Sequence, residues 1–478
     1  MAGKRPGKAV TRRLLAAVFN GRLDQARDMI GADPDPASLL KLARDGSGQT
    51  LLHRAAAGGD ERTITWALAL LAEHAWPVAL DEPDAAYHTP LMLAVAEGPH
   101  EGAVALLLEA GARPDTARPT GWSAVTYAAA AGSDACMSLL LAACGGDAAA
   151  CAGRRNKEGS TPAYLAARSG GLACLARLRG AGAPLGRRNH HERALLHAAA
   201  GWDRVDVARA LLCWGVEEQA GEEPSGGGGA VPGPAGDAPA LDRPGGTGRP
   251  ESLGPPGRQL LSRDESGATP LHMAAASDAA SAVALLLTSV LPHAGADGEL
   301  AAQPGAAALG AAVSVSWVPS ARACAAALAA TDTTGRTPLH AAALAGAASA
   351  LALLLRASEA CGSPLDAADA EGATALHAAA SAGHAGAVAA LLRAGADPAA
   401  PDGRAGQTAL HRAVSWGRDD VVLALLAHDA SLAALPDGAG RAASACVSGV
   451  RGPGDRGRTR RLLASTAEAL RRGGGTSE

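Results

Sequence analysis

The sequence has very few of the large side chains that usually fill a protein core. Of its 478 residues, 48% are hydrophobic but only 2% are aromatic, with one phenylalanine and three tyrosines. Most of the hydrophobic residues are alanines, and each alanine removes little apolar surface from water when it is buried. A conventional core built around large residues is therefore not expected. The composition favours short helices that pack closely because their side chains are small.

The sequence also lacks a disulfide pattern, a long apolar run and a large net charge. Its eight cysteines stand at irregular spacings without a C-x-x-C pair, which favours reduced thiols in an intracellular, cytoplasmic protein. No stretch approaches the roughly 18 uninterrupted apolar residues of a membrane helix. The formal net charge of −4 gives no general attraction to nucleic acid or to an acidic membrane. We expect neither of these partners.

The N-terminal segment is basic and allows two interpretations. Five basic residues precede the first acidic residue, Asp24: Lys4, Arg5, Lys8, Arg12 and Arg13. Such a segment vaguely resembles an organelle transit peptide. We favour a basic tail that leads into a capping helix over residues 14–30.

One short phrase recurs nine times along the chain. A clear copy is Thr337-Pro-Leu-His340, and the copies begin at residues 50, 89, 123, 161, 194, 269, 337, 374 and 408. Threonine suits a helix N-cap because its hydroxyl accepts a backbone N–H, and proline at the first helical position loses a donor that has no partner there. Alanines, a turn with glycine and a second run of bulkier residues follow. The pattern predicts two short helices per repeat and a tight Asx/Gly turn between repeats.

This pattern resembles the ankyrin repeat over about residues 45–435, apart from two insertions. The resemblance implies an all-α solenoid of about nine repeats with degenerate caps, in which paired antiparallel helices stack and hairpin loops project from one side. The predicted parts are a basic tail with capping helices (1–44), repeats 1–5 (45–216), a Gly/Pro-rich insertion (217–262), repeat 6 (263–287), an Ala-rich insertion (288–330), repeats 7–9 (331–436) and a degenerate C-terminal cap with a basic tail (437–478).

The two insertions differ in composition. Residues 217–259 contain many glycines and prolines and almost no bulky apolar residue, so we expect disorder there. They are either a plain insertion that can act as a hinge, which we favour, or a docking or modification segment. Residues 288–330 are richer in alanine and valine and are predicted to form a loop, although one or two helices are possible.

Catalytic and metal-binding motifs are not found. The histidine of the phrase recurs once per repeat, too far apart to share an ion whose bonds are about 2 Å long. The resemblance implies instead that it is structural and hydrogen-bonds a neighbouring loop. Gly226 to Gly229 lacks the lysine of a phosphate loop, and the basic C-terminus lacks the interleaved aromatics of a nucleic-acid site. No enzyme activity, metal, cofactor or small-molecule substrate is expected.

The resemblance places partner contacts on hairpin tips and at the end of the first helix of each repeat. Carried onto this sequence, these positions include Trp122, Trp202, Trp416, Arg168, Glu97, Arg336, Lys157, Glu158 and Arg404. Tryptophan is enriched in binding hot spots, and Trp202 and Trp416 occupy the same repeat position. The alternative is that each indole packs on a neighbouring turn.

The expected function is binding of a protein partner, whose identity the sequence does not give. One hypothesis is a scaffold or adaptor that holds the partner on its concave face and hairpin tips. The other is a regulatory or substrate-recognition subunit of an enzyme complex such as a ubiquitin ligase. The repeat array is compatible with both, because a fold does not determine a function.

Overall fold

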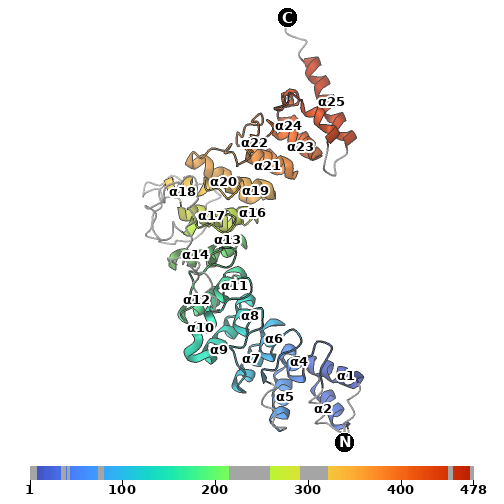
Figure 1. Cartoon of the computed structure of the whole chain (residues 1–478), viewed down its shortest axis with the longest axis vertical. Coiled ribbons are helices and arrows are strands. Elements are labelled where there is room, and N and C mark those ends of the chain that lie inside the picture. The colour runs from blue at the N-terminus through green and yellow to red at the C-terminus, as the bar shows by residue number, and fades with distance from the viewer. Residues whose placement is uncertain are drawn as a thin grey trace, which may run out of the picture. The chain divides into compact units, whose positions relative to one another are not determined.

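The computed structural model describes residues 8–33, 39, 43–73, 80–214, 259–290, 321–449 and 456–473. In these residues the regular secondary structure is helical, and the only β-type pairing is two isolated bridges, Ala117 with Ser123 and Pro436 with Ala442. The all-α prediction is confirmed. The chain divides into two compact units, Met1–Ala210 and Leu211–Glu478, which are described separately (Figure 1).

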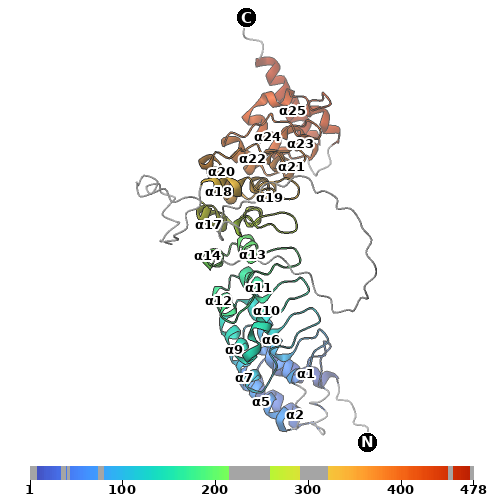
Figure 2. The same cartoon turned by 60° about the vertical axis from the view of Figure 1, so that its left-hand side comes forward.

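Unit 1 contains a helical cap and five helix pairs. The cap is α1 (Lys8–Phe19) and α2 (Leu23–Gly31). The pairs are α4 (Leu51–Gly58) with α5 (Glu61–Glu73), α6 (Pro90–Ala96) with α7 (Glu101–Glu109), α8 (Ala124–Ala131) with α9 (Asp134–Cys144), α11 (Pro162–Ser169) with α12 (Leu172–Gly180), and α13 (Leu195–Gly201) with α14 (Val205–Trp214), which runs into unit 2. Successive first helices pack on one another, and so do second helices, which gives two layers. The loops between repeats project to one side of these layers (Figure 2).

Unit 2 repeats the same arrangement. Its pairs are α16 (Pro270–Ala276) with α17 (Ala280–Val290), α19 (Pro338–Ala345) with α20 (Ala348–Cys361), α21 (Ala375–Ala382) with α22 (Ala385–Arg393), and α23 (Ala409–Ser415) with α24 (Asp419–His428). Each first helix begins one residue after the recurring threonine or its replacement, as the phrase predicts. Positions within a repeat are counted below from that residue as position 1.

In five of the nine repeats a histidine at position 4 links the repeat to the next hairpin. In repeat 1 the backbone N–H of Thr50 donates to Nδ1 of His53, at 3.3 Å, so the ring carries its proton on Nε2. That Nε2 donates to the carbonyl oxygen of His88, in the next hairpin, at 3.0 Å. The same bond, at 2.9–3.0 Å, joins His272 to Arg336, His340 to Ala373, His377 to Gln407 and His411 to Arg441. The histidines are therefore structural, as the resemblance implied.

A second repeated contact closes the hairpin between repeats. In nine of the ten described hairpins an Asp or Asn side chain accepts two backbone N–H groups that follow it, as Asp332 does from Thr334 and Arg336 at 2.8 and 2.9 Å. Neighbouring tips are joined by one backbone bond, such as Ala370 N–H to Thr334 O at 3.0 Å. Side-chain acceptors thus replace the hydrogen bonds of a β-ladder.

Four residues adopt the left-handed backbone conformation that glycine usually supplies at the hairpin and at the inter-helix turn. Tyr87 and Glu192 replace the hairpin glycine, with φ of 64° and 55°, and Asp203 and Asp278 replace the turn glycine, with φ of 53° each. The departures that the sequence shows at Tyr87 and Asp203 therefore do not shift the repeat register.

The ends of the array are helical caps. The single helix predicted over residues 14–30 is wrong: the chain breaks at Gly21, with φ of 68°, into α1 and α2. Glycine at this turn allows α2 to fold back against α1. At the other end, the 3₁₀ helix η6 (Ala443–Gly449) packs on α23 in the place of a first helix, and α25 (Arg456–Gly473) packs on α24 in the place of a second helix.

The Ala-rich insertion differs from the predicted loop at both described ends. Residues 288–290 continue α17, and α18 (Ala321–Leu328) packs against α17 and α20. Alanine-rich sequence favours helix, and Cys324 and Ala327 are buried. Most of the two insertions (215–258 and 291–320), like the basic residues 1–7, lies outside the described residues.

One stretch, Asp134–Gly153, is helical, long and apolar enough to cross a membrane, with a mean hydropathy of 1.6. In the structure it is three pieces: α9, a 3₁₀ turn over Gly145–Asp147, and α10 (Ala148–Gly153). Helix α9 packs against α7, α8 and α12, and buries Cys136, Met137 and Leu140. These buried side chains of α9 serve the packing of repeat 3.

Candidate functional site

Two tryptophans at position 9 are exposed on the first-helix layer. Trp202 ends α13 and Trp416 ends α23, and they are 59% and 42% exposed. Leu344, at the neighbouring position 8 of α19, is 41% exposed. Large apolar side chains left in water at the predicted contact positions are candidates for burial in an interface.

Trp122 lies in a different environment. Its ring centroid is 4.9 Å from that of Tyr127 in the same repeat, at a tilt of 42°. The Tyr127 hydroxyl in turn contacts His88 Nε2 at 3.2 Å and Arg118 Nη1 at 2.7 Å. Trp122 is thus half-buried in a cluster of repeats 2 and 3, and its packing on a neighbouring aromatic ring accounts for its presence there.

The other predicted contact residues fall into two groups. Glu97 is exposed at the end of α6, and Arg168 is half-buried in the last turn of α11. The rest are on hairpins: Lys157 and Glu158 are exposed on hairpin 4, whereas Arg336 and Arg404 belong to hairpins 7 and 9. Lys157 and Glu158 are neighbours in the sequence, whereas Arg336 and Arg404 form ion pairs with residues of neighbouring hairpins.

In three pairs of neighbouring repeats a side-chain clamp fixes the C-terminal end of a first helix. The side chain at position 11 of one repeat reaches over the turn of the preceding repeat and donates to the carbonyl at position 8. Arg204 donates to Arg168 O at 3.1 Å, His384 to Leu344 O at 3.1 Å, and Arg418 to Ser381 O at 3.1 Å. This clamp leaves no room for a Cβ on the turn glycine; a Cβ on Gly383 would lie 2.7 Å from Arg418 Cδ. The clamp therefore fixes the backbone at position 8 of repeats 4, 7 and 8.

The sequence interpretation missed the arginine that precedes the Asx residue of several hairpins. Arg44 donates to Glu82 Oε1 at 2.6 Å, in the next hairpin. Arg155, at the same position of repeat 4, donates instead to its own Gly159 O at 2.9 Å and to the carbonyl of Arg188. The signal was available in the aligned phrase, because Arg44, Arg155 and Arg188 share one register.

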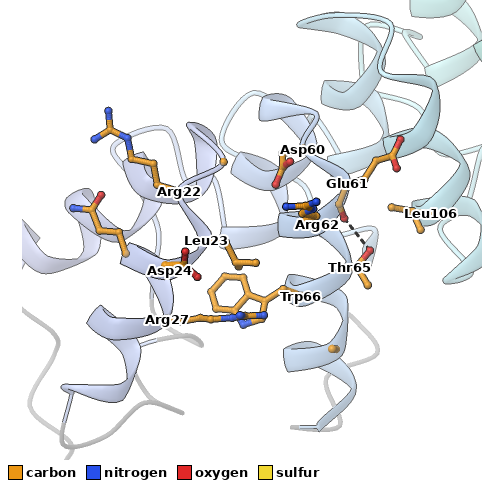
Figure 3. A pocket seen from close by; sticks show the side chains of 13 residues that line it. Arg22, Leu23, Asp24, Arg27, Asp60, Glu61, Arg62, Thr65, Trp66 and Leu106 are labelled. Carbon is orange, nitrogen blue, oxygen red and sulfur yellow. Dashed lines mark hydrogen bonds between the residues drawn. The ribbon is translucent and has the colours of Figure 1, made fainter.

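A pocket lies between the N-terminal cap and the first repeat of unit 1. Leu23, Asp24 and Arg27 from α2 face Thr65 and Trp66 from α5 across it (Figure 3). Its wall mixes acidic and basic side chains, and Asp60 on its rim caps α5 by accepting from Thr63 N–H at 2.9 Å. No feature of its wall selects a particular ligand chemistry.

Burial shifts the pKa values of several titratable groups in the described part of the chain. Burial lowers the pKa of His53, His272, His340 and His377, even though the hydrogen bond to a carbonyl raises it, so these rings are neutral. Burial also raises the pKa of the Cys174 thiol to about 11. Among the described residues no group of three or more His, Cys, Asp or Glu side chains has the arrangement of a metal site.

The comparisons with known proteins agree with this architecture. A family model described as "Ankyrin repeats (3 copies)" matches residues 14–118, 100–186, 126–220, 295–402 and 360–434. These matches cover well over half of the chain, and the chain belongs to the ankyrin-repeat family. No curated protein matched the sequence. Ankyrin repeats are in general protein–protein interaction modules, so the exposed positions in each unit are candidate protein-binding residues.

Proposed function

We propose that this protein is a non-enzymatic scaffold that binds a protein partner through the concave ends of its first helices and its hairpin tips. The observation that carries the proposal is the exposure of Trp202 and Trp416 at one repeat position, 59% and 42%. A tryptophan that becomes buried in an interface contributes more to binding than most residues. The half-buried Trp122 contributes less, because Tyr127 already covers one side of its ring.

The clamp and the histidine network support this proposal. Both hold the first helices by hydrogen bonds between repeats, so little conformational entropy is lost when a partner docks. We also propose a cytoplasmic location, because the eight cysteines stand at irregular spacings without a C-x-x-C pair.

The test is capture of partners from native lysate with the full chain, read by mass spectrometry. Trp202→Ala, Trp416→Ala and the double variant are compared with wild type, each shown by circular dichroism to be folded. The matched control is Leu423→Ala, which removes an apolar side chain that is 38% exposed on α24, in the second-helix layer. We expect partners that the control retains and the double variant loses.

The same experiment addresses the alternative function and the failure of the proposal. Recovery of the subunits of one enzyme, such as a ubiquitin ligase, would favour the regulatory or substrate-recognition role over a general scaffold. Equal capture by wild type and the double variant would show that the tryptophans are not the contact.

A further inference from the structure

The charges of unit 1 are segregated along the array although the whole chain is nearly neutral. Residues 45–112 carry ten Asp or Glu and two Arg, whereas residues 113–214 carry seven Asp or Glu and thirteen Lys or Arg. The positive excess is concentrated on two hairpins, 154–160 and 187–193, which hold six Lys or Arg and two Glu. We call these two segments the basic hairpins.

The residue at the Asx position of the hairpin turn explains part of this difference in charge between hairpins. Seven of the ten described hairpins use an aspartate at the turn position, and hydrogen bonds hold the pKa of several of them, such as Asp332, below its usual value although burial opposes this. The basic hairpins use Asn156 and Asn189 instead, and hairpin 3 has Arg118 there. Asn156 Oδ1 accepts from Glu158 and Ser160 N–H at 3.0 and 2.8 Å, so the turn is the same without the negative charge.

Three arginines of this region are held by neutral groups, whereas Arg188 lies 3.9 Å from the carboxylate of Glu192. Arg118 donates to Ala86 O at 2.9 Å, Arg154 donates to Asp115 O at 2.7 Å, and Arg155 donates to two carbonyls. None of these three guanidinium groups forms an ion pair within the described residues, and the exposed Lys157 and Arg187 form none there either. Carbonyl partners fix the position of a cation without cancelling its charge.

From this geometry we infer that the basic hairpins of repeats 4 and 5 bind an acidic segment of a partner protein, which deepens the proposed function and rests on it. Charge complementarity selects the occupant, and Trp202, exposed at the far end of the α13 helix that follows the second basic hairpin, supplies a separate apolar contact. The exposed Glu158 and Glu192 lie within the patch and repel an evenly charged phosphate backbone. A peptide can place neutral or basic residues opposite them.

The turn residues allow a test that changes charge with little change in shape. Asn156→Asp with Asn189→Asp installs the residue that other hairpins carry and adds two negative charges. Fluorescence anisotropy with the full chain measures binding of a labelled acidic peptide that alternates glutamate and serine. A neutral peptide that alternates glutamine and serine, and an oligothymidylate with the same net charge as the acidic peptide, are measured as controls. At ~0.1 M salt, where the Debye length is about 10 Å, we expect the double variant to bind the acidic peptide about tenfold more weakly than wild type.

The controls keep folding and function apart. Asp332→Asn with Asp369→Asn makes the reverse change in unit 2 and should leave the affinity for the acidic peptide within about twofold of wild type. If Asn156→Asp unfolds the protein, Lys157→Gln with Arg187→Gln, both on exposed side chains, should give the same loss.

Three results would overturn the inference. The first is equal affinity of the wild-type protein for the acidic and the neutral peptide. The second is an equal loss of affinity for the acidic peptide in the unit 2 control variant. The third is tighter binding of the oligothymidylate than of the acidic peptide, which would assign the basic hairpins to nucleic acid. If tryptophan-dependent capture from lysate persists while the acidic peptide fails, only this inference is wrong. If both fail, the proposed function is wrong as well.

Discussion

The hairpins of repeats 4 and 5 and those that precede repeats 7 to 9 and the C-terminal cap share the Asx turn but have opposite net charge. The former hold six basic and two acidic residues, whereas segments 331–336, 368–373, 401–407 and 436–441 hold three arginines and five acids. In the latter group each arginine lies near a carboxylate: Arg336 at 3.8 Å from Asp369, Arg404 at 2.9 Å from Glu371, and Arg441 at 2.9 Å from Asp437.

The comparison shows that the turn and the charge are independent. A tight Asx turn needs only one side-chain oxygen that accepts backbone N–H groups, and Asn189 supplies it as well as Asp369 does. The charge of a hairpin can therefore change without a change of fold. Stability comes from the histidine network and the buried alanine and leucine layers, which both units share.

The largest loss of stability is expected at the histidine hydrogen bonds, which both units share. His340→Ala in unit 2 and His53→Ala in unit 1 should each cost about 3 kcal/mol, because each leaves a buried N–H and a carbonyl without partners and opens a cavity. Since stability in a repeat array is mainly local, hydrogen exchange should rise around the mutated repeat. A loss below ~1 kcal/mol in only one unit would show that the network does not stabilise both.

A smaller loss of stability should distinguish an arginine that pairs with a carboxylate from one that donates to carbonyl groups. Arg412→Ala leaves Asp402, whose side chain is 2% exposed, without the cation at 2.9 Å, and should cost about 2 kcal/mol at neutral pH. Arg155→Ala removes bonds to carbonyls only and should cost about 1 kcal/mol.

Urea titrations at two pH values distinguish these two losses. The Arg412→Ala deficit should shrink in acid, because the unpaired Asp402 carboxyl then accepts a proton, while the Arg155→Ala deficit should stay constant. Equal pH dependence of the two variants would contradict the assignment of carboxylate and carbonyl partners.

Acid should weaken unit 2 more than unit 1. The lowered pKa values of the buried histidines mean that the unfolded chain binds protons below pH 6.5 before the folded one does. Stability is thus complete above pH 6.5 and falls as the pH drops, by at most ~1.4 kcal/mol per pH unit for each histidine. Among the described histidines whose pKa is shown to be lowered, three lie in unit 2 (His272, His340, His377) and one lies in unit 1 (His53).

Hydrogen exchange, corrected for the intrinsic pH dependence of the rates, reads the two units separately. Protection in residues 330–430 should fall faster between pH 7 and pH 5.5 than protection in 45–210. Rising protection in unit 2 over this range would contradict the neutral state of its histidines.

The smallest effect concerns the left-handed positions. Tyr87→Gly in unit 1 should stabilise the protein by about 1 kcal/mol, since Tyr87 is 56% exposed and has a φ of 64° that glycine adopts without strain. Asp278→Gly in unit 2 gains the same relief but loses the bond that Asp278 Oδ1 accepts from Ala350 N–H at 2.9 Å, so it should change stability by less than ~0.5 kcal/mol. Thermal melting measures the stability of both variants. Stabilisation by Asp278→Gly without stabilisation by Tyr87→Gly would contradict this prediction.

The amino-acid sequence by itself determined the local and periodic features. The threonine, histidine and glycine positions repeat at the spacing of one structural unit, so they predict the helix starts, the turns, the all-α class and the ankyrin-repeat family. They also mark the positions at which Trp202 and Trp416 are exposed, because a repeat position has a constant orientation. Cap and turn chemistry act over a few residues, which a sequence displays directly.

Only the tertiary structure decided which groups meet across repeats. The fold-back of α2 and the packing of α18 on α20 depend on contacts with neighbouring elements, and no local signal shows them. The same holds for the partners of Arg155 and Arg404: one guanidinium meets a carbonyl and the other a carboxylate, both 33 residues away in the sequence. Stacking brings those residues within hydrogen-bond distance, and it thereby decides where a positive charge is cancelled and where it remains available to a partner.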